Sequence, residues 1–406
     1  MLRPLLEPTV PVSRGWIGRF TLIWLGVWMA TLVPVQLALP DQLDRIDHAH
    51  RVRDFGLVNG LVGLAAVVTL PLFGALCDRT RSRLGRRRSW VAGGVVVFAA
   101  GLLLTGLQTG FVQLAGCWLL ASLGGNMISA GLTAAVADEV PDEQRGLVSG
   151  AIYGPQSVGI VLGLAVVTGL AASGRYAVLA LALVVLALPF LLGYRDVEAP
   201  GAAPLDLRHV VSGLWIDPRA NPDFAWAFGG RLLVNLGNAF ATTYLLFLLR
   251  DELHVPNPDA SLLQLTVIYL VFTLAATYLG GVLSDRTGRR RVFVAVASAL
   301  QAVAALVLAV HPTLGAALVC AALFGAGYGA FMSVDQALVT QVLPDAADRA
   351  KDLGIMNIGA VGPQAFGPLL ASLVISSLGG YRVLYAAAGL VTLLGTAMVY
   401  RIRSVR

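Results

Sequence analysis

Two charged residues, Arg231 and Asp335, lie inside long apolar stretches of the sequence. A charge in an apolar setting is costly unless it is paired, so such residues typically bind a charged group, carry a proton or join two helices. Arg231 lies eight residues after Asp223, and Asp335 lies nine residues before Pro344. If the two stretches are antiparallel helices, these spacings place both charges at a similar depth. An ion pair between them is therefore feasible, either to handle substrate or protons or only to hold the helices together.

Amide side chains accompany these charges. Asn235 and Asn238 follow Arg231 at four and seven residues, so the three polar groups share one face of a helix. Amides in apolar helices either line a binding site or only bond a neighbouring helix. The further amides that could take part in a substrate or proton site are Gln36, Asn126 and Gln336.

Acidic residues also lie beside clusters of arginine. Asp78 and Arg79 come shortly before residues 85–88, which read Gly-Arg-Arg-Arg, and Asp138 precedes Arg145 by seven residues. At the end of a membrane helix, where water reaches the side chains, such groups can form ion pairs with neighbouring helices. The alternative is that these arginines only mark the cytoplasmic side of a membrane.

The composition indicates the elements that carry these residues. Apolar residues make up 57% of the 406 residues and charged residues only 13%, whereas about a quarter of a soluble domain is charged. A membrane-spanning helix needs about 20 mostly apolar residues. The sequence therefore predicts an all-α integral membrane protein with twelve spans. The expected spans are 16–39, 55–77, 89–108, 111–136, 146–171, 176–194, 224–249, 261–284, 292–310, 313–342, 353–378 and 383–400.

The placement of basic residues predicts the orientation. Most of the 29 basic residues fall in segments that are cytoplasmic if the N-terminus is inside, including residues 79–88 and 286–291. We therefore expect a multi-pass protein of the cell membrane with both termini in the cytoplasm. Residues 41–54, which hold His48 and His50, are expected to form a solvated external loop that could at most bind a cation loosely or sense pH.

The two halves of the chain resemble each other. Residues 74–88 match 280–291, and Gly154-Pro155-Gln156 matches Gly362-Pro363-Gln364 in the same order. Six spans in each copy give both copies the same topology, which is a parallel repeat. We expect a six-helix bundle at 1–194, a cytoplasmic central loop at 195–223 and a second six-helix bundle at 224–406.

These motifs resemble the major facilitator superfamily over about residues 15 to 400. Asp78-Arg79 with the glycine and arginines of 85–88 is similar to that family's loop between its second and third helices. The extended motif at 78–90 resembles the glycoside–pentoside–hexuronide cation symporters and the sucrose carriers. Gly150, Gly154 and Pro155 instead resemble a motif of proton-coupled drug exporters, although the following glycine pair is displaced.

The resemblance implies a fold, an activity and a set of gate residues. It implies alternating access between two bundles, a cavity lined by the seventh and tenth spans, and a latch on the cytoplasmic side. Asp138 and Arg145 are spaced like an acid and an arginine of the superfamily's sugar carriers, and the resemblance implies that they pair with arginines such as Arg86 or Arg87. The latch residues carried over are Asp78, Arg79, Gly85, Arg86, Arg87, Asp138 and Arg145 in the first half, and Asp285, Arg286, Gly288 and Arg289 in the second.

The sequence therefore predicts a secondary transporter for a small organic solute. Proton-coupled uptake of a sugar-like solute is slightly favoured over proton-coupled export of an amphipathic compound, and a sensor without transport is a remote alternative. No nucleotide-binding loop or hydrolase motif is found, so an enzyme is not expected. We also expect no cofactor, no metal and no nucleic acid, and a monomer in the bilayer.

Overall fold

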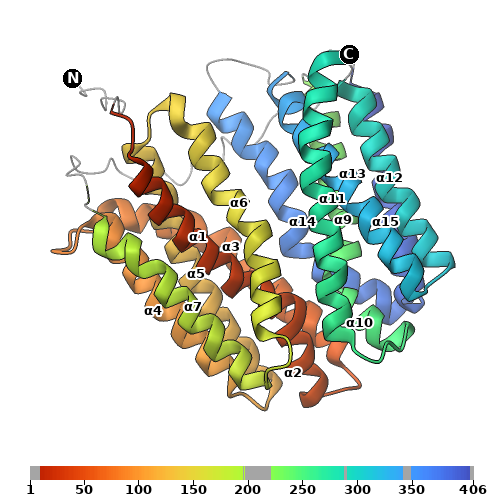
Figure 1. Ribbon diagram of the computed structural model, residues 1–406, viewed down its shortest axis with the longest axis horizontal. Helices are drawn as coiled ribbons and strands as arrows, with labels where there is room; N and C mark the ends of the chain where they lie inside the picture. The colour runs from red at the N-terminus through yellow and green to blue at the C-terminus, as the bar shows by residue number, and fades with distance from the viewer. Residues whose placement is uncertain (1–9, 195, 197–220, 288–289, 342–348, 403–406) are drawn as a thin grey trace. The chain divides into compact units, whose positions relative to one another are not determined.

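The computed structural model describes residues 10–194, 196, 221–287, 290–341 and 349–402 (Figure 1). The described residues form helices joined by short turns. Eleven helices are long and apolar enough to cross a membrane. Residues Pro222–Thr243 and Leu245–Glu252, which meet at a 41° bend, add a twelfth if the bent pair is one span. The all-α membrane fold predicted from the sequence is confirmed.

The described contacts group the chain into two units. Unit 1 comprises residues 1–51 and 64–205, and unit 2 comprises 52–63 and 206–406. Residues 52–63, the start of one long helix, therefore group with the second unit. The bundle boundaries expected from the sequence stay a prediction.

The helices of unit 1 carry the first half of the repeat. The first span is one nearly continuous helix in three segments, whose N-cap is Ser13, with its side-chain oxygen accepting the backbone N–H of Trp16. The elements are α1 (Arg14–Val33), the π-helix η1 (Pro34–Ala38), α2 (Leu39–Ile46), α3 (Arg51–Arg79, whose residues 52–63 group with unit 2), α4 (Arg86–Gly106), α5 (Phe111–Glu139), α6 (Asp142–Val167) and α7 (Ala172–Gly193).

The helices of unit 2 carry the second half. The elements are α9 (Pro222–Thr243), α10 (Leu245–Phe247), the π-helix η2 (Leu248–Glu252), α11 (Pro258–Thr287), α12 (Arg290–Val310), α13 (Leu314–Gln341), α14 (Arg349–Leu378) and α15 (Gly380–Tyr400).

Helices pack in the same order within each unit. In unit 1, α1 packs on α6 and α7, and α4 packs on α5 and α7. In unit 2, the helices at the matching positions repeat this pattern, because α9 packs on α14 and α15, and α12 packs on α13 and α15. The parallel repeat expected from the sequence is thus present in the helix packing as well.

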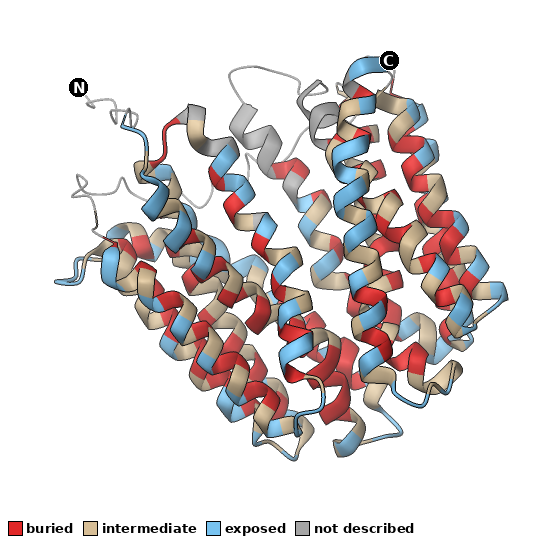
Figure 2. Cartoon of the chain, viewed as in Figure 1, coloured by how far each residue is buried: buried red, intermediate tan, exposed pale blue. Residues whose placement is uncertain are grey.

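Close helix packing in unit 2 depends on glycine. A Cβ atom on Gly325 would lie 2.2 Å from the carbonyl oxygen of Tyr269, and one on Gly329 would lie 2.1 Å from that of Thr273. Both distances are too short for any side chain, so these glycines let α13 approach the backbone of α11. Buried and exposed residues alternate along the helices, as Figure 2 shows, because each helix buries one face and leaves the other for lipid.

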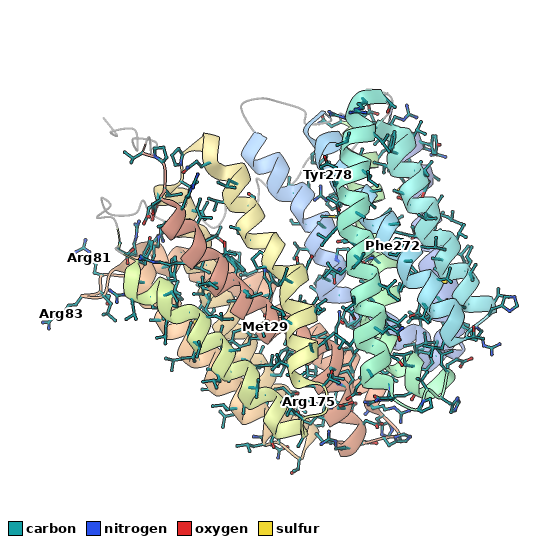
Figure 3. All side chains as sticks on the ribbon, viewed as in Figure 1. Met29, Arg81, Arg83, Arg175, Phe272 and Tyr278 are labelled. Carbon is teal, nitrogen blue, oxygen red and sulfur yellow. The ribbon has the colours of Figure 1, made fainter. Side chains whose placement is uncertain are left out.

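Residues 41–46 differ from the solvated loop expected at 41–54. The first span continues as α2 to Ile46, and Asp41 is buried and paired with Arg175 at the start of α7 (Figure 3). Gln42 is buried too, and its amide donates to the carbonyls of Thr105 and Gln108 at 2.7 and 2.9 Å. The loop prediction was wrong here because apolar periodicity does not reveal that a terminal polar turn has buried partners.

Residues 48–50 of this segment are exposed, whereas Asp54 is buried in the first turn of α3. The ring Nδ1 of His50 lies 2.8 Å from a carboxylate oxygen of Asp47, and this hydrogen bond lowers the pKa of the Asp47 carboxyl. The contact is local, so nothing about it indicates a binding site.

Unit 2 has a tie at the matching place. The side chains of Tyr381 and Arg382, at the start of α15, bond to Asp251 and Glu252 in η2, with a distance of 2.7 Å from Arg382 Nε to Glu252 Oε1. In both units the end of the first span is therefore bonded to the start of the sixth. We call these two contacts the terminal ties.

Candidate functional site

A buried ion pair lies in unit 2. Arg231 of α9 and Asp335 of α13 approach to 2.9 Å between Nη1 and Oδ2, and their side chains are only 2% and 5% exposed. The same two helices also contribute Phe224, Val234 and Phe331 to a buried apolar cluster. The ion pair between Arg231 and Asp335, which the sequence indicated as feasible, is present. Its role in transport stays a prediction.

The hydrogen bonding of this pair is incomplete. Among the residues that the structure describes, neither Nε of Arg231 nor Oδ2 of Asp335 has a hydrogen-bond partner, although both atoms are fully buried. The 2.9 Å approach is therefore an ion-pair contact without the alignment of a hydrogen bond. Buried polar atoms are normally satisfied, so this pair keeps a capacity to bind a further group.

Amides and tyrosines extend the polar surface away from the pair. Asn235 is buried one turn beyond Arg231 and donates to the Arg231 carbonyl at 2.8 Å. Its Oδ1 accepts a long contact of 3.5 Å from the hydroxyl of Tyr328 on α13. Asn238 donates to the hydroxyl of Tyr269 on α11 at 3.3 Å. The two tyrosine rings are roughly parallel, with centroids 6.3 Å apart.

We call these six residues the polar line of unit 2. It runs along one face of α9 and is closed by side chains from α11 and α13. Its members are Arg231, Asn235, Asn238, Tyr269, Tyr328 and Asp335.

The other predicted amides lie elsewhere. Asn126 of α5 is half-buried and donates to the hydroxyl of Thr69 on α3 at 2.9 Å, so within unit 1 it bonds two helices. Gln36 lies half-buried in η1. Gln336 belongs to α13, but its side chain is outside the described residues.

A second cluster of charges lies in unit 1. Arg87, whose side chain is 4% exposed, contacts Asp78 at 2.6 Å and Asp138 at 2.8 Å, and Arg86 contacts the same oxygen of Asp138 at 2.9 Å. The expected pairing of Asp138 with Arg86 and Arg87 is confirmed. Arg87 is therefore the buried cation that joins the ends of α3, α4 and α5 within this unit.

Asp196 completes this cluster. Its two carboxylate oxygens each accept a backbone N–H at the start of α4, from Arg87 and Arg88, at 2.9 Å. Gly85 adopts a positive φ of 97°, and a Cβ there would lie 2.0 Å from Asp196. Glycine is therefore needed twice at this position, for the backbone conformation and for the close approach of the cap.

Some predicted latch residues are not part of this cluster. Arg79 is exposed, and so are Arg81 and Arg83, which point away from the helices of unit 1 (Figure 3). In the second half Arg286 is exposed. Gly288 and Arg289 lie outside the described residues, as do the side chains of Arg145 and Asp285.

Sequence reasoning missed three kinds of residue. Tyr269 and Tyr328 stand in apolar runs and carry no signal of their own. Asp196 lies just after a span, where an acidic residue usually is solvated. Arg175 falls between the expected spans 146–171 and 176–194, in what would be an external loop, whereas the structure places it in the first turn of α7.

The packing and the two charge clusters define a polytopic membrane protein built from a parallel repeat of six helices, with a buried ion pair in its second half. The sequence profile described as Major Facilitator Superfamily matches residues 20–256 and 227–406. The chain belongs to the Major Facilitator Superfamily.

Solved structures agree with this fold. A transporter of the POT family in complex with a thioalcohol-conjugated peptide is similar, with a TM-score of 0.72 and 11% identity over 95% of this chain and 94% of that one. A variant of the nucleoside transporter NupG has a TM-score of 0.72 and 15% identity, over 95% of this chain and 98% of that one. These identities are low, so the likeness concerns the fold alone. A comparison with curated protein sequences found no significant match.

Proposed function

We propose that the chain is a secondary active transporter that moves a small organic solute by alternating access, with solute flux coupled to protons. Membership of the superfamily supports transport. The observation that supports coupling is the buried Arg231–Asp335 pair with its unsatisfied atoms. A carboxyl group can exchange a proton when its partner is drawn away, so a solute that engages Arg231 would favour protonation of Asp335.

Uptake of a sugar-like solute is the version that the polar line favours. The amides of Asn235 and Asn238 and the hydroxyl groups of Tyr269 and Tyr328 offer both donors and acceptors. The tyrosine rings offer flat apolar faces. Such a mixture suits a compact solute with hydroxyl groups, and it matches the resemblance of residues 78–90 to sugar symporters.

Export of an amphipathic compound is the second candidate. The supporting observation is Pro155, which lies inside α6 and follows Gly150 and Gly154 in the spacing of the exporter-like motif. A proline within a span removes one helical hydrogen bond and marks a place where the helix can bend.

Transport by the purified chain in proteoliposomes tests the proposal. With an imposed pH gradient, we expect uptake or extrusion of a labelled solute that stops when the gradient is collapsed. Labelled sugars and amphipathic cations assayed in parallel separate the two candidates. Asp335→Asn should lose proton coupling, and proton-driven transport by this variant with unchanged pH dependence would exclude Asp335 as the coupling site. We further propose that the chain works as a monomer in the cell membrane with both termini cytoplasmic.

A further inference from the structure

The charges of the polar line bear on the charge of the solute. Among the described residues of this line there is one cation, Arg231, and one carboxyl group, Asp335, and the remaining groups are neutral amides and phenols. A charged solute that binds in this line therefore competes with one partner of the pair for the other. The partner that is displaced has to remain buried without its counter-ion.

Asp335 and Arg231 differ in how they tolerate the loss of a counter-ion when they are buried. A carboxylate that loses its counter-ion can become neutral by taking up a proton. A guanidinium group cannot lose its charge at any pH a cell experiences. A cationic solute that paired with Asp335 would leave Arg231 charged at 2% exposure, whereas an anionic solute that paired with Arg231 would leave a group that can be neutralised.

The unused hydrogen-bonding capacity of Arg231 also favours an anionic solute. Nε of Arg231 is buried and has no acceptor among the described residues, and the closest approach of Asp335 to the guanidinium is at Nη1. A guanidinium group presents its donors as a fork that fits the two oxygens of a carboxylate. Asp335 leaves part of that fork unused.

We propose that the transported solute is a small organic acid whose single carboxylate replaces Asp335 on Arg231, while Asp335 takes up one proton from the aqueous phase. This rests on the proposed function and narrows its solute to an anion, which is compatible with a hydroxylated, sugar-like body. The site is neutral before the exchange, with Arg231 paired to Asp335. It is neutral afterwards, with Arg231 paired to the solute and Asp335 protonated.

The charge balance of this exchange predicts that transport is electroneutral. One monoanion and one proton cross together, so transport changes the pH inside a vesicle but carries no net charge. Symport of a neutral solute with a proton would instead generate a current. The two cases are therefore distinguished by whether a current is measured, and not only by the rate of transport.

The test uses proteoliposomes containing the full chain, with a trapped pH dye and with current recording on a supported membrane. The probes are matched acids and amides: D-glucuronate with D-glucuronamide, and hippurate with hippuramide, together with D-glucose. We expect the acids to raise the melting temperature of the purified protein and to move with protons without current. The amides should be roughly tenfold weaker or worse, since they lack the charge that Arg231 binds.

Two variants and a control sharpen the result. Asp335→Asn removes the competing carboxylate, so acids should bind at least as tightly as to the parent and lose the strengthening that falling pH gives. Arg231→Gln should abolish the preference for acid over amide. Arg382→Gln is the control, because Arg382 is an exposed arginine of the same unit that pairs with Glu252 at 2.7 Å, and it should leave the preference unchanged.

The outcomes separate this inference from the proposed function. Equal binding of acids and amides, or a proton-linked current with D-glucose and no response to any acid, would overturn acid recognition and leave proton-coupled transport standing. Acid transport accompanied by current would overturn the exchange with Asp335. If no solute of either kind moves, the proposed function is wrong as well. If Arg231→Gln does not fold, acid binding by Asp335→Asn still decides the matter.

Discussion

Removing one partner of the Arg231–Asp335 pair should destabilise unit 2 strongly. At the 2.9 Å separation of Nη1 and Oδ2, two unit charges attract by about 6 kcal/mol with an effective dielectric constant of about 20. Part of this is offset by the loss of hydration. Breaking a buried pair by removing one partner typically costs about 3–5 kcal/mol. We expect losses in this range for Arg231→Met and for Asp335→Val, because each leaves one charge in an apolar core.

The double variant should recover most of this loss. Replacing a buried pair by apolar groups of similar size is often neutral, since no charge then remains buried. The expected coupling between the two substitutions is about 2–3 kcal/mol. The double variant should nevertheless remain inactive in transport if either residue handles solute or protons.

The assay is equilibrium unfolding in mixed detergent micelles. Cys77 and Cys320 are free and buried, so a thiol-reactive dye reports unfolding without added cysteines. Arg382→Met serves as the control, because an exposed ion pair contributes only about 0–1 kcal/mol. Single variants as stable as the parent, or a double variant that loses the full sum of the two, would show that Arg231 and Asp335 do not stabilise unit 2 as a buried ion pair.

Three further predictions concern topology, the unit 1 cluster and helix packing. Thiol labelling of single cysteines in a cysteine-free background should find residues 79–88 on the cytoplasmic side, and labelling only from outside would reverse the orientation. Asp138→Asn removes the carboxylate shared by two arginines, so it should lower transport and stability more than Asp78→Asn, whose side chain is 44% exposed; transport at the parent rate in both would reduce these residues to topology signals. Gly329→Ala should lower the melting temperature, with overpacking costing about 1–3 kcal/mol, whereas Gly281→Ala, whose nearest neighbour is 3.9 Å from the added Cβ, should not; similar melting temperatures would contradict the close approach of α11 and α13.

The sequence could predict how deep the charged residues of the candidate site lie within their helices. Helical rise converts residue counts into distance, so Arg231 and Asp335 could be placed at a similar level before any contact was known. The pairing of Asp138 with Arg86 and Arg87 was predicted from the resemblance of Asp138 and Arg145 to residues of the superfamily's sugar carriers. Both predictions rest on charges, which are rare enough in this chain to have few possible partners.

The remaining contacts depend on which faces of two helices meet. Tyr269 and Tyr328 join the polar line because α11 and α13 pack closely through glycine, and nothing in an apolar run marks a tyrosine as facing another helix. The buried pair of Asp41 and Arg175 was missed for a similar reason. Both residues lie at helix ends, where solvation is the ordinary expectation, and only the packing of neighbouring elements buries them.

The cap that Asp196 places on α4 has a practical bearing on how this protein can be enlarged for electron microscopy. A rigid fusion partner is commonly inserted in a loop between the two halves of such a chain. Only one residue lies between Tyr194 and Asp196, and the backbone N–H of Tyr194 still bonds to Phe190 as the last turn of α7 ends. An insertion between these positions would withdraw both oxygens of Asp196 from the start of α4. It would also remove the carboxylate that packs against Gly85. A fusion joined on the C-terminal side of Asp196 keeps that anchor, so the added domain is connected to a fixed point of unit 1.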